Sequence, residues 1–377
     1  MKLTIAGESH GKAICGILTN VPSGIKLDEN HINSILAERN GAFGRSERQL
    51  FENDKIEIIS GVRGGYTLGD NLSFLIKNAA HEERLADMDV WDTSESARAR
   101  NAKTAPRAGH ADLSGLLKFG FNDITDVSEG ASARFTCAFT AGGAIALSFL
   151  NALGIEIEAG VCGIGDYDEF FTPSFSTVKK AKPPLYLIND EKTESVRAFV
   201  KQAENRGDTL GGKVVISAKN VKAGFGSYVC EKRVNGLIAA LLMQMPAVRG
   251  VYFGDNPFNN PTGIERADLI GYNENAGGFF RFSNHSGGIE GGMTNGEEIS
   301  VTVAIRPVPT LKRETETADY ISKNTVAAFS PRSDVTAVFA ACPILKCMLA
   351  LALSEAVCDR LGCDNLADIK ERYDKLP

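Results

Sequence analysis

The chain of 377 residues has few or none of the features that mark several large classes of protein. Its 41 lysines and arginines are outnumbered by 47 aspartates and glutamates, and the formal charge of −6 argues against broad binding of nucleic acid. None of the eight cysteines forms a Cys-x-x-Cys pair or a cysteine–histidine metal spacing, so we expect no metal site. No apolar run is expected to be long and clean enough to span a bilayer.

What remains is the composition of an ordinary globular protein, 43% hydrophobic and 23% charged. Most cysteines lie in apolar runs, where reduced core thiols are expected, and no signal peptide is expected before Gly7. We therefore expect a cytoplasmic protein with no membrane or nucleic-acid partner. An anionic small ligand remains compatible with the acidic chain, because a local arginine cluster can create a positive cleft.

Apolar periodicity and glycine turns predict a chain of mixed helices and strands, with antiparallel pairing near the N-terminus. The run from Thr136 to Leu150 is rich in alanine and glycine, which predicts a buried helix. No Gly-x-Gly-x-x-Gly spacing followed by an acidic residue is present, so a dinucleotide-binding fold is not supported. Strands are predicted near residues 3–5, 56–59, 72–76, 155–163, 211–218, 245–253 and 299–305, and helices near residues 28–38, 128–154, 193–206, 233–243 and 343–361.

The stretch from Thr104 to Phe119 carries the strongest functional signal. Pro106 and Gly109 break regular structure, and apolar residues at helical spacing follow, so a loop is predicted to lead into a helix. Arg107 and His110 fall in that loop, where free backbone N–H groups can receive an anion. A histidine there can hold a charge or move a proton near neutral pH. The alternative is a histidine that only caps its own helix.

Four other segments place polar groups beside glycines or apolar sequence. Ser9 and His10 stand in a predicted turn that could bind a phosphate or carboxylate, or could simply be a solvated hairpin. Arg134 opens the buried helix and needs either a structural carboxylate or a bound anion. The loop of residues 39–48 contains several arginines and could close over a phosphorylated ligand or lie in solvent. The pair Arg332 and Asp334 predicts either a functional site or a buried ion pair.

Four of these segments, taken in their order along the chain, resemble chorismate synthase, and the likeness covers nearly the whole chain. They are the segments of Ser9 and His10, of Arg107 and His110, of Ser132 and Arg134, and of Arg332 and Asp334. The family's motifs are Gly-Glu-Ser-His-Gly, Gly-His-Ala-Asp-Leu, Ser-Ala-Arg before an alanine- and glycine-rich helix, Gly-Gly-x-(Ser/Thr)-(Asn/Ser)-Gly, Pro-x-Pro-Thr and Arg-x-Asp. They stand here at residues 7–11, 109–113, 132–146, 291–296, 307–310 and 332–334.

The resemblance implies an α+β fold, a single large β-α-β sandwich of antiparallel sheets with buried helices, over residues 1–377. It implies a lyase that converts 5-enolpyruvylshikimate 3-phosphate to chorismate and phosphate by 1,4-anti elimination. It further implies a requirement for reduced FMN, possible use of NADPH as reductant, and assembly as a homotetramer.

The resemblance also assigns roles to residues. His110 is the histidine that protonates the reduced flavin, His10 is the one near the leaving phosphate, and Asp334 with Ser9 and Ser132 relays the proton that leaves the substrate. The residues implied for FMN are Gly130, Ala131, Ser132, Pro246, Ala247, Gly291, Arg306, Pro307, Val308, Pro309, Thr310 and Arg332. Those implied for the nucleotide are Arg39 and Arg45, and those for the substrate are Arg48, Arg107 and Arg134.

The sequence departs from the family pattern at three places. The loop after Arg39 reads Asn40-Gly41-Ala42 instead of Pro-Gly, Phe135 stands where Glu is usual, and Ser333 stands where His is common. None of these changes touches His10, His110 or Asp334, so we predict a working enzyme. The rival interpretations are an NADPH-dependent flavin reductase, a non-catalytic paralogue that binds flavin or an anion, and a structural protein with satisfied histidines.

Overall fold

A four-stranded antiparallel sheet forms one outer layer of the computed structural model, which describes residues 1–45, 53–84, 88–94, 102–168, 173–255, 262–274, 278–328 and 333–377. Its strand order is β1-β2-β6-β3. Gly16 on β2 faces Phe74 on β6, and an added Cβ at Gly16 would lie 2.2 Å from the phenyl ring. The strands are β1 Lys2–Ala6, β2 Ala13–Thr19, β3 Glu57–Ser60 and β6 Leu72–Lys77.

A five-stranded antiparallel sheet forms the opposite layer, with the order β10-β15-β9-β7-β8. Its central strands are buried along most of their length and on both faces, because helices pack against them. The register pairs Val301 of β15 with Ile216 of β9, and Ile216 in turn with Ala159 of β7. The strands are β7 Glu156–Ile164, β8 Tyr167–Asp168, β9 Gly212–Lys219, β10 Val248–Phe253 and β15 Ile299–Ile305.

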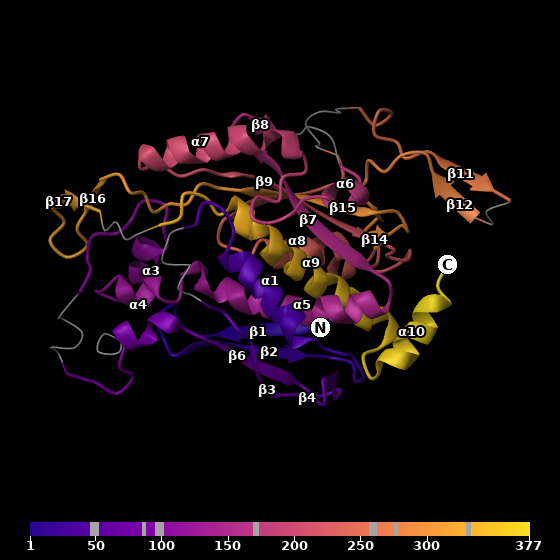
Figure 1. Cartoon of the computed structure of the whole chain (residues 1–377), viewed down its shortest axis with the longest axis horizontal. Helices are drawn as coiled ribbons and strands as arrows, with labels where there is room; N and C mark the ends of the chain where they lie inside the picture. The colour runs from indigo at the N-terminus through magenta and orange to yellow at the C-terminus, as the bar shows by residue number, and fades with distance from the viewer. Residues whose placement is uncertain are drawn as a thin grey trace.

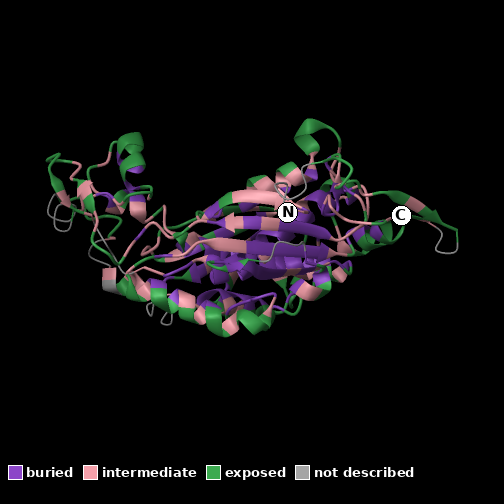
Figure 2. Ribbon diagram, turned by 90° about the horizontal axis from the view of Figure 1, so that it is seen from above, coloured by how far each residue is buried: buried purple, intermediate pink, exposed green. Residues whose placement is uncertain are grey.

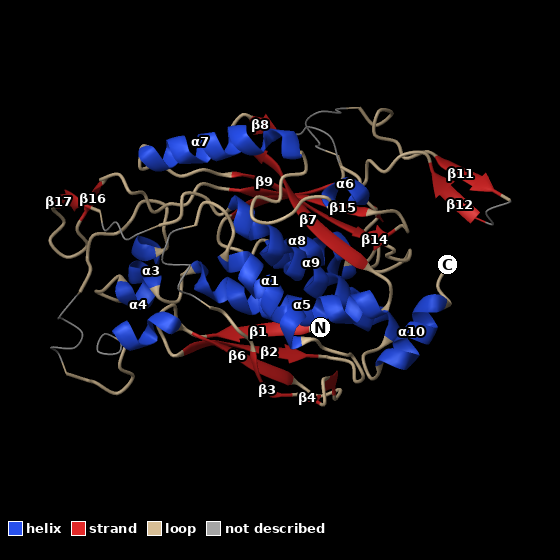
Figure 3. Cartoon of the chain, viewed as in Figure 1, coloured by secondary structure: helices blue, strands red, loops and turns tan. Residues whose placement is uncertain are grey.

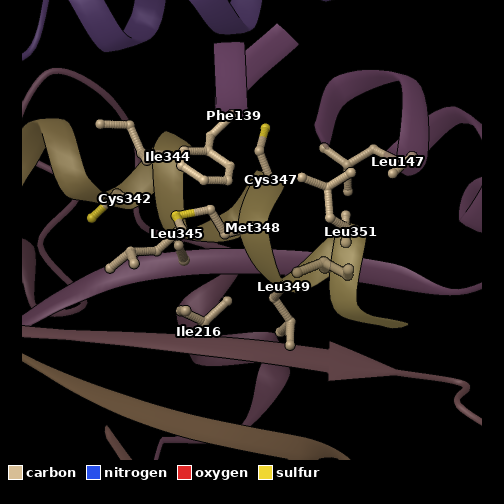
Figure 4. Close-up of a cluster of buried hydrophobic side chains, with 14 of the residues drawn as sticks. Phe139, Leu147, Ile216, Cys342, Ile344, Leu345, Cys347, Met348, Leu349 and Leu351 are labelled. Carbon is tan, nitrogen blue, oxygen red and sulfur yellow. The ribbon is translucent and has the colours of Figure 1, made fainter. Parts of the chain in front are cut away.

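Three helices lie between the two sheets (Figures 1 and 3). They are α1 Glu29–Asn40, α5 Thr136–Ala152 and α9 Val338–Leu361. Helix α5 packs closely on α9 because Gly143 has no side chain, and a Cβ there would lie 2.3 Å from the Cβ of Cys347. Figure 4 shows Phe139 of α5 and Ile216 of β9 on opposite sides of Met348.

The remaining elements surround this sandwich. Helix α7 lies on the outside of the five-stranded sheet, and the β11–β12 hairpin extends away from the body (Figure 1). The helices are α3 Asp112–Phe119, α4 Thr125–Ser128, α6 Phe175–Val178, α7 Thr193–Asn205, α8 Val234–Leu242 and α10 Leu366–Asp374, with 3₁₀ turns at Ala79–Arg84, Ala133–Phe135, Asp190–Lys192 and Cys230–Lys232. The short hairpins are β4 Val62–Arg63 with β5 Tyr66–Thr67, β11 Ile270–Asn273 with β12 Gly278–Arg281, β13 Ile289–Glu290 with β14 Met293–Thr294, and β16 Glu316–Ala318 with β17 Thr325–Ala327.

The α+β sandwich with antiparallel sheets and buried helices is confirmed, with corrections in detail. The predicted helix at 128–154 is interrupted, because α4 ends at Ser128 and a 3₁₀ turn at Ala133–Phe135 precedes α5. The last long helix begins at Val338, and Pro343 lies inside it instead of at its start. Packing of a largely buried helix between two sheets outweighs the one hydrogen bond that a proline removes.

The expectation that no apolar run is long enough to cross a membrane is wrong, because two segments have the length and the composition of a membrane span. The 24-residue α9 meets that test, and so does the segment Thr125–Ala152. Their apolar windows are 89% and 78% buried inside the protein, so both are accounted for as core helices. Figure 2 shows the buried residues gathered in the middle of the molecule. The five cysteines at 137, 162, 342, 347 and 358 are buried free thiols, as expected.

Candidate functional site

His110 is held by a buried carboxylate at the start of α3. Asp112 is fully buried, and its carboxylate accepts hydrogen bonds from the backbone N–H of Arg107 at 3.0 Å and from Nε of Arg107 at 2.8 Å. Its second oxygen lies 2.5 Å from Nδ1 of His110. Burial by itself would raise the pKa of Asp112, but the bonds from His110 and Arg107 hold that pKa well below its usual range.

The hydrogen-bond geometry indicates which nitrogen of His110 is available for proton transfer. Nη2 of Arg107 also lies 3.0 Å from Nδ1, but a guanidinium only donates and a carboxylate only accepts. Nδ1 therefore serves one partner or the other, and the shorter contact with the charged Asp112 assigns it a proton. Nε2 is then the nitrogen that can accept or release a proton in catalysis.

His10 is held in the turn between β1 and β2 by a carboxylate from a distant segment. Glu129 accepts the backbone N–H of His10 at 2.8 Å with one oxygen and lies 2.8 Å from Nδ1 of the same residue with the other. The backbone N–H of Ser9 donates to the carbonyl of Glu129 at 3.1 Å. Burial would raise the pKa of Glu129, but the contacts with His10 lower it below the usual value.

A third carboxylate holds two arginines in the interior. Asp54 accepts hydrogen bonds from Arg134 at 2.8 Å and from Arg39 at 3.2 Å, and its other oxygen lies 2.7 Å from Arg134. The three side chains are no more than 4% exposed. Despite burial, the two guanidinium groups hold the pKa of Asp54 below its usual range. Two cations face one anion here, so the trio carries one excess positive charge.

These contacts decide two questions that the sequence left open. The partner of Arg134 is a structural carboxylate, Asp54. Arg39, predicted in a loop, lies instead in the last turn of α1, where it is 1% exposed and donates to Thr136 at 3.1 Å. Arg45 lies beyond the helix, where its guanidinium donates to the carbonyl of Arg39 at 2.9 Å and its Nε lies 3.4 Å from the carboxylate of Asp334.

A cavity of about 440 Å³ opens beside Arg107. Arg306, which follows β15, donates to the carbonyl of Gly109 at 2.7 Å, and its backbone N–H donates to the carbonyl of Ala247 at 2.9 Å. Thr310 accepts a hydrogen bond from Arg107 at 3.4 Å. Nε of Arg306 is buried and has no hydrogen-bond partner among the residues that the structure describes, which leaves a donor for an acceptor atom of a ligand. The lining residues are Arg107, Ala108, Gly109, Asp208, Thr209, Arg306, Pro307, Val308, Pro309, Leu311, Thr315 and Ala328.

The structure brings the predicted residues together in two groups. The first gathers Ser9, His10, Ser132, Arg134, Arg39, Arg45 and Asp334, and within it Ser132 donates to Ser9 at 3.2 Å. The second gathers Arg107, His110, Ala247, Arg306 and the segment 307–310. Lys103 interacts electrostatically with Glu129, which holds His10 of the first group, and with Arg107 of the second, and burial lowers the pKa of Lys103.

Some predicted residues are not placed in either group. Gly291 lies in the turn of the β13–β14 hairpin, and Gly130 and Pro246 are exposed. Arg48 and Arg332 lie outside the residues that the structure describes. Conversely, sequence reasoning missed three residues that hold the site together: Asp54, Asn78 and Glu129. A buried arginine signals that a carboxylate must exist, but nothing in the chain says which one.

The fold and these contacts give a site with two histidines, each held by a carboxylate, and several arginines, which is a set of groups suited to acid–base catalysis on an anionic ligand. The family model described as chorismate synthase matches residues 1–358. A chorismate synthase of Moorella thermoacetica is 37% identical over 99% of this chain and 97% of its own length. One of Thermus thermophilus is 37% identical over 100% of this chain and 98% of its own.

A solved structure agrees with the sequence comparisons. A crystal structure of chorismate synthase superposes with a TM-score of 0.78 at 32% identity, and the match covers 99% of this chain and 96% of that one. The chain therefore belongs to the chorismate synthase family.

Proposed function

We propose that this protein converts 5-enolpyruvylshikimate 3-phosphate to chorismate and phosphate by 1,4-anti elimination, and that residues 1–377 form one catalytic domain. Membership of the family makes it a lyase of the shikimate pathway to aromatic amino acids. The observation that carries the proposal is the pair of histidines, His10 and His110, each fixed by a carboxylate, with Arg107 bound to the carboxylate that holds His110. Two such histidines supply acid–base catalysis near neutral pH.

The substrate is proposed to bind through arginines. It carries a phosphate and two carboxylates, which planar guanidinium groups bind well. Arg107 borders the cavity, and Arg134 belongs to the buried trio with one excess positive charge. Arg48 remains a proposed substrate contact from the sequence alone.

The cavity beside Arg306 fits the reduced FMN that the resemblance implies. Its volume of about 440 Å³ lies in the range of small-ligand pockets, and the orphaned Nε of Arg306 offers a donor to an anionic or carbonyl-bearing group. Ala247, Arg306, Pro307, Val308, Pro309 and Thr310 would hold it from this side, with Gly130, Ala131, Ser132, Pro246, Gly291 and Arg332 as further proposed contacts. When bound, the reduced flavin supplies the electron donation that the protein lacks.

The protein's own part is to hold and move protons. Asp112 fixes His110 with a proton on Nδ1, so Nε2 is the atom that donates near the cavity. His10 is proposed to donate to an oxygen of the departing phosphate. The proton that leaves the substrate is assigned to Ser9, Ser132 and Asp334, of which the two serine hydroxyls are in contact.

We further propose NADPH as the source of electrons, with Arg39 and Arg45 as its contacts. Arg39 is 1% exposed, so a nucleotide phosphate would reach it only after its contact with Asp54 opens. We also propose a cytoplasmic homotetramer. Apolar side chains on and beside the β11–β12 hairpin support association, because they are exposed: Leu269, Ile270, Tyr272, Phe279, Phe280 and Phe282.

The test is an anaerobic assay with the purified chain, chemically reduced FMN and 5-enolpyruvylshikimate 3-phosphate. We expect chorismate absorbance and released phosphate to rise in equal amounts over many turnovers. Replacing the chemical reductant with NADPH then tests the nucleotide: turnover shows that the protein reduces its own flavin, and its absence assigns reduction to an outside source. Bound FMN without chorismate under chemical reduction would overturn the catalytic proposal.

A further inference from the structure

Asn78 lies at the end of β6, beside the turn between β1 and β2 that contains His10. It follows β6 directly, and β6 pairs with β2 so that Lys77 lies opposite Ala13. The backbone N–H of Asn78 donates to the carbonyl of Lys12 at 3.2 Å. The residue is 7% exposed, so its side-chain amide has to find partners inside the protein.

Both the nitrogen and the oxygen of that amide have hydrogen-bond partners, acceptors for the nitrogen and a donor for the oxygen. Nδ2 donates to the carbonyls of Glu8 at 2.9 Å and Gly11 at 2.7 Å. Oδ1 accepts a hydrogen bond from Nε of Arg134 at 2.7 Å. A flipped amide would place its oxygen against two carbonyls and its donors against a guanidinium. The three contacts therefore agree on a single orientation.

The two carbonyls that Asn78 binds stand at the two ends of the turn that contains Ser9 and His10. The backbone N–H of Gly11 donates to the carbonyl of Glu8 at 3.2 Å, which closes the turn. Glu129 holds the ring and the backbone N–H of His10. The turn is thus fixed through its carbonyls by Asn78 and through its donors by Glu129.

We propose that Asn78 is a positioning residue that sets the place of His10 relative to Arg134. Arg134 is itself fixed by its paired contacts with Asp54, so Asn78 connects the turn to a rigid, buried ion pair. This inference rests on the proposed roles of His10 in proton transfer and of Arg134 in substrate binding. A displacement of about 1 Å at a reacting group can lower a rate by about 100-fold.

The test is Asn78→Asp, because the side chain of aspartate has the same shape as that of asparagine. One carboxylate oxygen still accepts from Arg134, whereas the other faces the carbonyls of Glu8 and Gly11 and pushes the turn away. We expect hydrogen exchange at the backbone amides of Ser9 and His10 to quicken by at least about tenfold, because an opening that costs 1.4 kcal/mol less is ten times more frequent. The kcat should fall by about 10- to 100-fold, with the dissociation constant of FMN within about twofold, because only the turn is misplaced.

The control is Asn71→Asp, the same substitution at the exposed other end of β6, which should leave exchange, kcat and FMN binding unchanged. Should Asn78→Asp not fold, Asn78→Ser removes the amide donors without adding charge and should quicken exchange at the same two amides. Unchanged exchange at Ser9 and His10 in the folded variant would overturn the inference. Exchange needs no substrate, so this result is separate from failure of the wild-type chain to form chorismate, which would overturn the proposed function instead.

Discussion

His10 and His110 are held by the same chemistry but built in different ways. Each places Nδ1 against a carboxylate, at 2.8 Å from Glu129 and at 2.5 Å from Asp112. Asp112 stands two residues after its histidine, in the first turn of α3, which follows the loop of His110, and it is fully buried. Glu129 stands 119 residues after its histidine, and its side chain is 13% exposed.

The two histidines therefore depend on the rest of the fold to different degrees. The His110 group is a local unit, since Arg107, His110 and Asp112 all lie within six residues. The His10 group exists only when the turn after β1, the end of β6 and the segment before α5 have come together. In the His110 group a single carboxylate, that of Asp112, makes the stabilising contacts. In the His10 group these contacts are shared between Glu129 and Asn78.

The largest effect is expected when Asp112 becomes Asn. The amide loses the charge that opposes the guanidinium of Arg107, whose side chain is 9% exposed, and breaking such a buried pair costs about 3 kcal/mol or more. The donor end of the amide is repelled by Arg107 or His110, so we expect turnover to fall by about 100-fold or more. Urea unfolding measures the loss of stability, and the anaerobic assay measures the loss of turnover. A variant with wild-type turnover would contradict the claim that Asp112 holds His110 in place for catalysis.

Glu129→Gln is the matched change at His10 and should be milder. The amide oxygen still accepts from Nδ1, the backbone bond from Ser9 remains, and Asn78 still holds the turn. We expect turnover to fall by about 10-fold, within the range of a positioned acid–base group. The free energy of unfolding should fall by about 1 kcal/mol. A loss as large as that of Asp112→Asn would show that the two histidines are held equally firmly.

The pH dependence of stability should separate the two carboxylates. The folded protein lowers the pKa of both, and more strongly for Asp112. A lowered folded-state pKa contributes stability that is complete above the unfolded value of about 4 and is lost as the pH falls through the folded value. We therefore expect the wild-type free energy of unfolding to decline below about pH 4, and Asp112→Asn to flatten that decline more than Glu129→Gln. If the free energy of unfolding falls equally with pH in the wild type and in both variants, the stronger lowering of the Asp112 pKa would be contradicted.

A third histidine–carboxylate pair gives the smallest expected effect. Nδ1 of His285 lies 2.5 Å from Asp255, next to the Ser300 end of β15, whereas Arg306 follows the opposite end of that strand. His285→Asn should leave turnover within about twofold and cost about 1 kcal/mol of stability, the value of one hydrogen bond. A large loss of turnover would mean that the catalytic region extends further than His10 and His110.

The same contrast explains how much the sequence predicted. Strands such as β15 and helices such as α5 were predicted because their apolar spacing is local and strong. Helix α10 and the β11–β12 hairpin were missed. The apolar face of α10 reduces to Ile369 and Tyr373, and the residues of the hairpin are largely exposed, so neither carries a clear buried pattern.

Within the site, what could be predicted was again what is local. The loop before α3 and the position of Asp112 at its start followed from glycine, proline and apolar spacing. The partner of Arg134 and the burial of Arg39 could not be predicted, because Asp54 meets both only after α1 packs beside α5. The residues that hold the turn of His10 lie in two distant segments, and one sequence contains no signal that joins them.

The most direct test of the account is His110→Ala under anaerobic conditions, with FMN binding and chorismate formation measured on the same sample. We expect FMN still to bind, because Arg306, Ala247 and Thr310 remain, while turnover falls by about 100-fold or more with the loss of the proton donor. Turnover equal to that of the wild type would contradict the central claim and leave His110 as a residue that only caps its own helix.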